Sequence, residues 1–130
     1  SSLWQMLVVC GKTIRFRKVS LMKYMVDIDG TICKEIFLPD GKKDYANHQP
    51  MQERIAKINK LYDEGHEIHY WTARGATSGI DYTLLTKQQL EKWGCKFHSV
   101  RVGDKPHYDI WVDDKAHNSE EFFKDDSKDT

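Results

Sequence analysis

The sequence predicts an α/β fold: a mostly parallel, Rossmann-like sheet in a single domain, with helices on both faces. Three observations favour this class. Short runs rich in β-branched and aromatic residues alternate along the chain with stretches of helical periodicity. The length of 130 residues suits one domain. A hydrophobic content of 39% is enough for a packed core and too high for a disordered chain.

Four runs are predicted to be strands because valine, isoleucine and aromatic residues are frequent in them. They are Lys23–Ile28, Glu67–Thr72, Phe97–Val102 and Asp109–Asp113. Strands that are separated by helices are joined by right-handed crossovers, so we expect these runs to lie parallel in one sheet.

Two helices are predicted between these strands. The first follows Pro50, which suits the first helical position, and stops before Gly65. The second runs over Tyr82–Trp93, with Asp81 as its N-cap and Gly94 as its stop. The apolar positions of the first helix recur at helical spacing: Met51, Ile55, Ile58, Leu61 and Tyr62.

Two segments flank the predicted domain, which spans residues 22–118. Residues 1–21 form either an appendage or an extra hairpin, because two β-rich runs flank Cys10, Gly11 and Lys12. Residues 119–130 are an acidic tail, predicted to be a short helix or a solvated end.

Charge and cysteine content exclude several classes of protein. The formal net charge is zero, so the chain lacks the overall basic field of a protein that lives on nucleic acid or on an anionic membrane. The basic run Arg15–Lys18 is interpreted as a solvated strand face, with nucleic-acid contact as the alternative.

The three cysteines are far apart and form no C-x-x-C motif, so neither a disulfide framework nor a zinc knuckle is indicated. No apolar stretch approaches the roughly 20 residues that span a bilayer, so we expect a cytoplasmic protein.

Candidate site residues lie where the predicted strands end. In an open parallel sheet, ligands bind beyond the carboxyl ends of the strands, so residues distant in sequence meet there. The first strand leads into Asp27, Asp29 and Thr31, the second into Thr72, Ala73 and Arg74, Lys105 lies just before the fourth, and Asp113 and Asp114 end it.

These residue types together suit phosphoryl transfer. Of two neighbouring carboxylates, one can attack as a nucleophile while the other moves a proton, which fits Asp27 and Asp29. Asp113 and Asp114 supply oxygen ligands that could hold Mg²⁺ together with Asp27. Lys105 would offset the negative charge of such a site when a phosphate enters it.

The same residues resemble a known family. Residues 27–31 read Asp-Ile-Asp-Gly-Thr, which resembles the first motif of the haloacid dehalogenase superfamily of phosphohydrolases. Thr72, Lys105 and the pair Asp113 and Asp114 resemble its second, third and fourth motifs in the same order, and the likeness covers Met22 to Asn118. The stretches ending at Arg74 and at Asp114 are also similar to small phosphatases associated with surface-polysaccharide synthesis.

The resemblance implies a role for each residue. Asp27 would be the nucleophile that becomes an aspartyl-phosphate, and Asp29 would protonate the leaving group and then activate water. Thr72 and Lys105 would hold the phosphate, with Thr31, Ala73 and Arg74 as further substrate-binding candidates; a salt bridge or a solvated position is the alternative for Arg74. Mg²⁺ would be bound by Asp27, the backbone carbonyl of Asp29 and either Asp113 or Asp114, with Asp114 favoured as the direct ligand.

The expected activity is therefore magnesium-dependent hydrolysis of a small phosphorylated metabolite, such as a sugar phosphate. Residues 32–49 have room only for a flap or hairpin, so the chain resembles the superfamily members without a large cap, whose open site is covered by such a flap or by an oligomer neighbour. Two alternatives stay open: a nucleotidase or polynucleotide end phosphatase, and a non-catalytic module that binds magnesium and phosphate.

Overall fold

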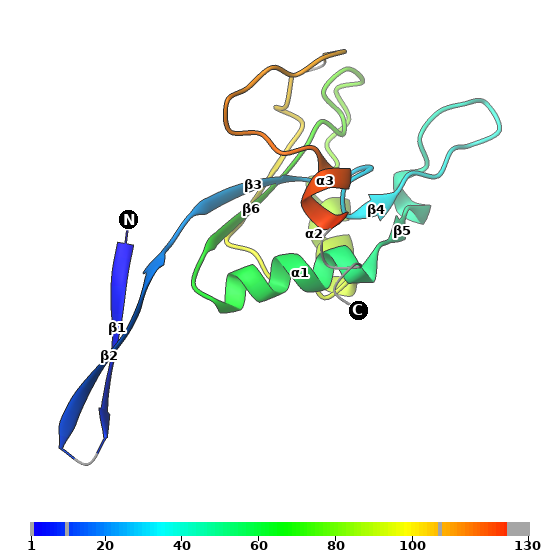
Figure 1. Cartoon of the computed structure of the whole chain (residues 1–130). Coiled ribbons are helices and arrows are strands. Elements are labelled where there is room, and N and C mark those ends of the chain that lie inside the picture. Colours follow the sequence, from blue (N-terminus) through cyan, green and yellow to red (C-terminus); the bar gives the residue numbers. More distant parts are fainter. Residues whose placement is uncertain (1, 10, 107, 125–130) are drawn as a thin grey trace.

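The computed structural model describes residues 2–9, 11–106 and 108–124 (Figure 1). Cys10 therefore lies outside the described residues. Cys33 and Cys95 are free thiols. The elements in chain order are β1 (Ser2–Val9), β2 (Lys12–Ser20), β3 (Lys23–Asp27), β4 (Cys33–Lys34), the 3-10 helix η1 (Tyr45–Asn47), β5 (Gln49–Pro50), α1 (Gln52–Asp63), β6 (Glu67–Thr72), α2 (Thr83–Lys92), β7 (Ser99–Val102) and α3 (Ser119–Lys124).

The central sheet has three parallel strands in the order β3-β6-β7. Asp27 lies opposite Trp71 in the register of β3 with β6, and Thr72 lies opposite Val102 in that of β6 with β7. The carboxyl ends of all three strands therefore meet at one edge. Helix α1 connects β3 to β6 and α2 connects β6 to β7, so the predicted parallel α/β class and three of the four predicted strands are confirmed.

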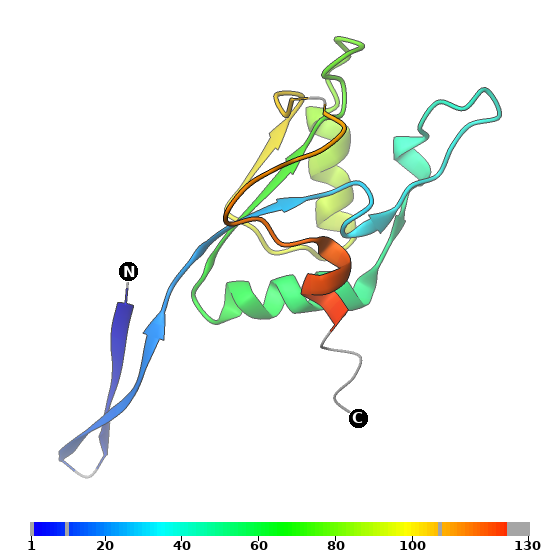
Figure 2. The same cartoon turned by 45° about the horizontal axis from the view of Figure 1, so that its top comes forward.

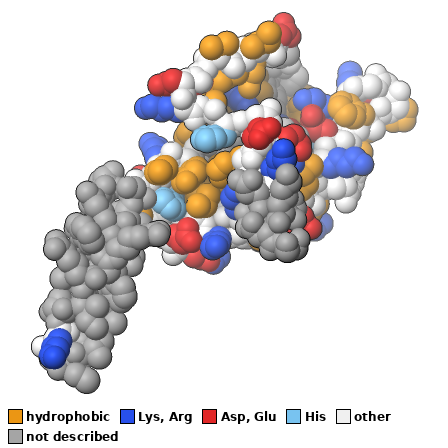
Figure 3. All heavy atoms as spheres, viewed as in Figure 1, with side chains coloured by type: hydrophobic (Ala, Val, Ile, Leu, Met, Phe, Trp, Pro, Cys, Tyr) orange, Lys and Arg blue, Asp and Glu red, His pale blue; other side chains and the backbone are white. Residues whose placement is uncertain are grey.

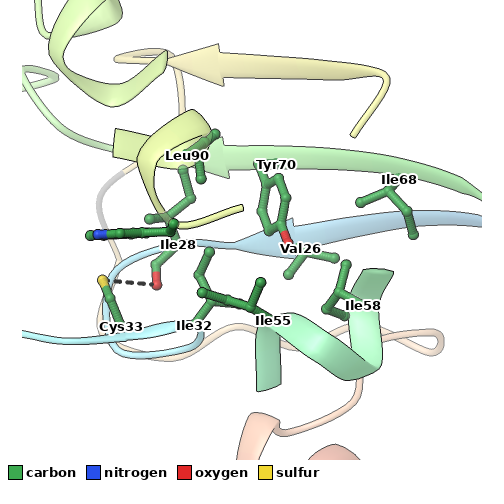
Figure 4. Close-up of a cluster of buried hydrophobic side chains, with 10 residues drawn as sticks. Val26, Ile28, Ile32, Cys33, Ile55, Ile58, Ile68, Tyr70 and Leu90 are labelled. Carbon is green, nitrogen blue, oxygen red and sulfur yellow. Dashed lines mark hydrogen bonds between the residues drawn. The ribbon is translucent and has the colours of Figure 1, made fainter. Parts of the chain in front are cut away.

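Both long helices pack on the same face of the sheet, not on opposite faces as expected. Their apolar side chains enter one buried cluster with Ile68 and Tyr70, which alternate onto one face of β6 (Figure 4). The strand order explains this placement, because two successive right-handed crossovers that progress in one direction put both helices on one side. The cluster consists of Val26, Ile28, Ile32, Cys33, Ile55, Ile58, Ile68, Tyr70, Leu90 and Trp93.

The predicted fourth strand is wrong: residues 109–113 contain no strand. Ile110 and Val112 are 81% and 92% exposed, and the ring of Trp111 packs edge-on against that of Trp71 instead. Apolar alternation in this run fits a strand, but a strand needs a neighbour, and the outer edge of β3 pairs with none of the described residues. Figure 3 shows hydrophobic side chains gathered on the surface over β3.

The helix ends follow the predicted signals only in part. Pro50 pairs with Cys33 in the short β4–β5 ladder and does not open α1. The carboxylate of Asp81 accepts a hydrogen bond from Thr83 N at the start of α2. Gly65 and Gly94 follow the two helices with φ of 101° and 78°, a left-handed conformation that favours glycine and ends a helix.

Residues 33–50 form the expected flap. Strands β4 and β5 close its base, and a bridge between Phe37 and Lys43 narrows its stem. Lys43 also forms an ion pair with Glu35 at 2.8 Å. Phe37 and Leu38 near its tip are exposed, and the tip projects away from the sheet (Figures 1 and 2).

The two ends of the chain behave differently. β1 and β2 form the antiparallel hairpin that was one of the two expectations for residues 1–21, and it extends away from the sheet (Figure 1). Helix α3 packs on α1, where Lys57 Nζ donates to the carbonyl oxygen of Phe122 at 2.6 Å. Among the described helices, none is long and apolar enough to cross a membrane.

Candidate active site at the carboxyl ends of the strands

The first part of the site is the turn that follows β3. Asp27 is the last residue of the strand, and the chain then turns through Gly30, whose φ of 81° is easily reached only by glycine. Thr31 N donates to the carbonyl oxygen of Ile28 at 3.1 Å. This turn carries Thr31 back towards the strand, where its Oγ1 donates to Asp27 Oδ2 at 3.3 Å.

Lys105 and Asp27 form the central ion pair of the site, although they are far apart in sequence. Lys105 Nζ lies 2.7 Å from Asp27 Oδ1. The side chain of Asp27 is 37% exposed and that of Lys105 only 13%, so the carboxylate can meet a ligand from solvent. Burial raises the pKa of Asp27 and the charge of Asp29 adds to this, while Lys105 and Thr31 oppose the rise.

Asp29 is held much more tightly than Asp27. Thr72 Oγ1 donates to its Oδ2 at 2.7 Å. Arg74 Nη2 donates to Oδ1 at 2.8 Å, and Arg74 Nε lies 3.1 and 3.2 Å from the two carboxylate oxygens. Burial alone would raise the pKa of Asp29, but the hydrogen bonds and charge of Arg74, followed by Thr72 and His48, outweigh it and lower this pKa.

Arg74 is a buried structural partner of Asp29. Its side chain is not available for the expected contact with substrate. Its side chain has no exposed surface. Its Nη1 donates to Gln89 Oε1 at 2.6 Å and to Thr86 Oγ1 at 3.2 Å, and the ring of Tyr45 covers its guanidinium. The salt-bridge alternative for Arg74 is therefore the arrangement observed.

Thr72 and Ala73 differ in their exposure at the site. The hydroxyl of Thr72 is buried, since it donates to Asp29 and accepts a hydrogen bond from Arg74 N at 3.2 Å. Ala73 is exposed, and its carbonyl oxygen accepts from Ala76 N in the turn after β6. In this arrangement Thr72 supports Asp29, and only Ala73 of the two offers surface to a ligand.

His48 is a site residue that the sequence did not indicate. It lies in the flap between η1 and β5, is 3% exposed, and places its Nε2 3.4 Å from Asp29 Oδ1. Burial lowers the pKa of His48, while the charge of Asp29 opposes the shift. No motif or spacing marks this histidine, because its partner lies on a different element.

Asp113 and Asp114 are not brought to Asp27. Both are exposed, and the carboxylate of Asp113 accepts hydrogen bonds from Trp111 Nε1 at 3.2 Å and from Lys115 N at 2.8 Å. In the part of the chain that the structure describes, no three Asp, Glu, His or Cys side chains are grouped so that they could hold a metal ion. Asp113 and Asp114 are therefore separate from the other three groups of candidate site residues, because residues 109–113 do not pair with β3.

Two carboxylates of opposite character thus lie side by side. Asp27 is partly exposed, paired with a single lysine and suited to attack an electrophile beside a positive charge. Asp29 is an ionised carboxylate with a fixed orientation, held by Thr72 and Arg74. Pairs of titratable groups with opposite pKa shifts are typical of acid–base sites.

The comparisons with known proteins support the fold. The chain is similar to a structural-genomics target from Vibrio cholerae, known from its crystal structure, with 25% sequence identity and a TM-score of 0.66. The match covers 79% of this chain and 88% of that chain. No protein-family model and no curated protein matches the sequence. The chain is therefore a small single-domain α/β protein with a parallel sheet.

Proposed function

We propose that this chain is a phosphomonoester hydrolase of the haloacid dehalogenase type, in which Asp27 takes the phosphoryl group from the substrate. The observation that carries the proposal is the ion pair of Lys105 with a partly exposed Asp27 at the end of β3. Lys105 favours the ionised, attacking form of the carboxylate, and its positive charge favours the approach of a phosphate.

The proposed reaction has two steps. Asp27 Oδ attacks phosphorus, the ester bond to the leaving alcohol breaks, and an aspartyl-phosphate forms. Water then attacks phosphorus, phosphate leaves, and the Asp27 carboxylate is restored. Asp29 is proposed to exchange the protons of both steps, giving one to the leaving oxygen and taking one from water.

The low pKa of Asp29 has a consequence for the first of these steps. Since the resting carboxylate is ionised, the protonated form that serves as acid is scarce at neutral pH. The second step, in which Asp29 takes a proton, is favoured by the resting form. We therefore expect hydrolysis to be fastest for esters whose leaving group needs little protonation, such as aryl phosphates.

Magnesium is expected from the resemblance to the haloacid dehalogenase superfamily. In the superfamily such an ion offsets the charge of the phosphate. Of the expected oxygen ligands, Asp27 and the backbone of Asp29 lie at the end of β3, whereas Asp113 and Asp114 lie apart. The donor set of this arrangement therefore does not fit the ion, and the roles proposed for the side chains do not depend on it.

A small phosphorylated metabolite, a sugar phosphate first, is the proposed class of substrate. The flap, residues 33–50, adjoins the site, since its residues Tyr45 and His48 contact Arg74 and Asp29. A site without a larger cover admits small substrates without a domain movement.

The test is phosphate release from p-nitrophenyl phosphate by the full chain and by Asp27→Asn, each with Mg²⁺ and with chelator. The proposal expects the wild type to turn over and Asp27→Asn to lose at least about a thousandfold in kcat, the scale seen when a nucleophile is removed. Asp63→Asn is the matched control, because Asp63 is an exposed carboxylate that pairs with Lys96 on the surface. Equal rates for Asp27→Asn and wild type would overturn the proposal, and equal rates with Mg²⁺ and with chelator would show that the reaction does not need the ion.

A further inference from the structure

The flap contacts the acidic pair through one buried side chain, His48. Two hydrogen-bonding positions of its ring face different parts of the molecule. Ile36 N, in the flap, donates to Nδ1 at 3.2 Å. Nε2 faces Asp29 Oδ1 at 3.4 Å, across the gap between the flap and the end of β3.

The first of these contacts fixes where the ring carries its proton. Because Nδ1 accepts from Ile36 N, the proton of the neutral imidazole lies on Nε2. Nε2 is buried and forms no hydrogen bond with the residues that the structure describes. A buried N–H needs an acceptor, and Asp29 Oδ1 is the oxygen in front of it.

The other nitrogen and hydroxyl donors to Asp29 come from one side, and from the side of the flap only the thiol of Cys33, among the described residues, forms a hydrogen bond with Oδ1, at 3.9 Å. Thr72 and Arg74 both belong to the end of β6 and to the turn after it. His48 approaches from the flap. The contact from Cys33 is a long one to sulfur, so on the flap side the position of Oδ1 is fixed less strongly than on the side of Thr72 and Arg74.

We propose that His48 is a positioning residue for Asp29: its Nε2–H holds Oδ1 from the flap side and so keeps the carboxylate in the orientation needed for proton transfer. This inference rests on the proposed function in one respect, namely that Asp29 moves protons during hydrolysis. It assigns to the flap a role in ordering the site.

Two substitutions separate this role from a merely structural one. His48→Asn puts an acceptor near the position of Nδ1, so it keeps the bond from Ile36 N but cannot reach Asp29. His48→Gln puts an N–H near the position of Nε2, so it keeps the donor to Asp29 and loses the acceptor for Ile36. The two variants therefore each remove one of the two contacts.

The expected result is a loss of about tenfold in kcat for His48→Asn with little change in KM, since the proposed contact of Nε2–H with the charged carboxylate is lost without loss of substrate contacts. His48→Gln should stay within about threefold of the wild type. The reverse order would show that His48 only anchors the flap backbone and would overturn the inference. Equal kcat values for wild type and both variants would overturn it as well.

A second measurement does not depend on activity. Arg74 Nε donates to both oxygens of Asp29, so its N–H signal in proton–nitrogen NMR reports the orientation of that carboxylate. The signal should move in His48→Asn and stay in His48→Gln; no movement in either would refute the positioning role. If the wild type hydrolyses no phosphomonoester, the proposed function fails, and the NMR result still decides whether His48 orients Asp29.

Discussion

The guanidinium of Arg74 donates hydrogen bonds to both carboxylate oxygens of Asp29: Nη2 lies 2.8 Å from Oδ1, and Nε lies within 3.2 Å of both oxygens. The arginine side chain is fully buried and the aspartate side chain is 12% exposed. The remaining nitrogen of the guanidinium, Nη1, donates to Gln89 and Thr86 of α2. Arg74 thus connects Asp29, the candidate proton-transfer group, to helix α2. The geometry of the site and the stability of the fold therefore depend on the same side chain.

Replacing Arg74 by lysine should lower the free energy of unfolding by about 3 kcal/mol, since breaking a buried pair leaves an uncompensated carboxylate and lysine cannot supply the same hydrogen bonds. Urea unfolding measures this. Arg101→Lys is the control, because Arg101 pairs with Asp104 at the surface, where both side chains are about half exposed. That variant should lose no more than about 1 kcal/mol. Equal losses in both variants would contradict the structural role of Arg74.

Replacing Lys105 by glutamine should reduce kcat/KM by about a hundredfold, a typical loss when one charge-stabilising donor is removed from a transition state. Lys105 Nζ is 2.7 Å from Asp27 and no other lysine is paired with that carboxylate among the described residues. Lys96→Gln serves as the control, since Lys96 pairs with Asp63 away from the site. A loss in Lys96→Gln that equals the loss in Lys105→Gln would refute the assignment.

Strands β3, β6 and β7 and the groups of site residues that follow them could be predicted from the sequence, because each depends on a short local pattern. Each of these strands is a short run with several β-branched or aromatic residues, and ligands of an open parallel sheet bind beyond the carboxyl ends of its strands. Asp27, Thr72 and Lys105 each lie at or just beyond such an end, and the structure brings them together.

Two features of the structure could not be predicted from the sequence, the contacts of the flap with the site and the lack of a strand at residues 109–113. Both depend on partners that are distant in sequence. His48 and Tyr45 contact Asp29 and Arg74 only because the flap returns to the edge of the sheet at η1, while its tip points away. The alternation of residues 109–113 predicts a strand, yet it carries no information about which edge would pair with it. The position of Asp113 and Asp114 depends on that pairing, and so does the metal site expected from them.

The two acidic residues should affect the pH dependence of stability in opposite directions. The pKa of Asp29 is lower in the folded state, so its contribution to stability is complete above the unfolded value of about 3.9 and is lost as the pH falls through the folded value. The pKa of Asp27 is raised, so its protonation favours the folded state as the pH falls. Urea unfolding between pH 6 and pH 3 should therefore show a smaller loss of stability in Asp29→Asn than in wild type, and a larger loss in Asp27→Asn. Identical slopes in the two variants would contradict both assignments.

The exposure of residues 108–112 gives the last prediction, which tests the departure from the expected fourth strand. Val112 is 92% exposed, so Val112→Thr should change the free energy of unfolding by no more than about 0.5 kcal/mol. Val26→Thr is the matched control, because Val26 is 8% exposed within the core cluster and its substitution buries a hydroxyl, at a cost of about 1–3 kcal/mol. Both changes are isosteric, so shape does not differ between them and only burial does. If Val112→Thr were as costly as Val26→Thr, residues 109–113 would be buried in solution as a strand beside β3. Asp113 and Asp114 would then lie at the same edge as Asp27, and the metal ligands expected from the sequence would be restored.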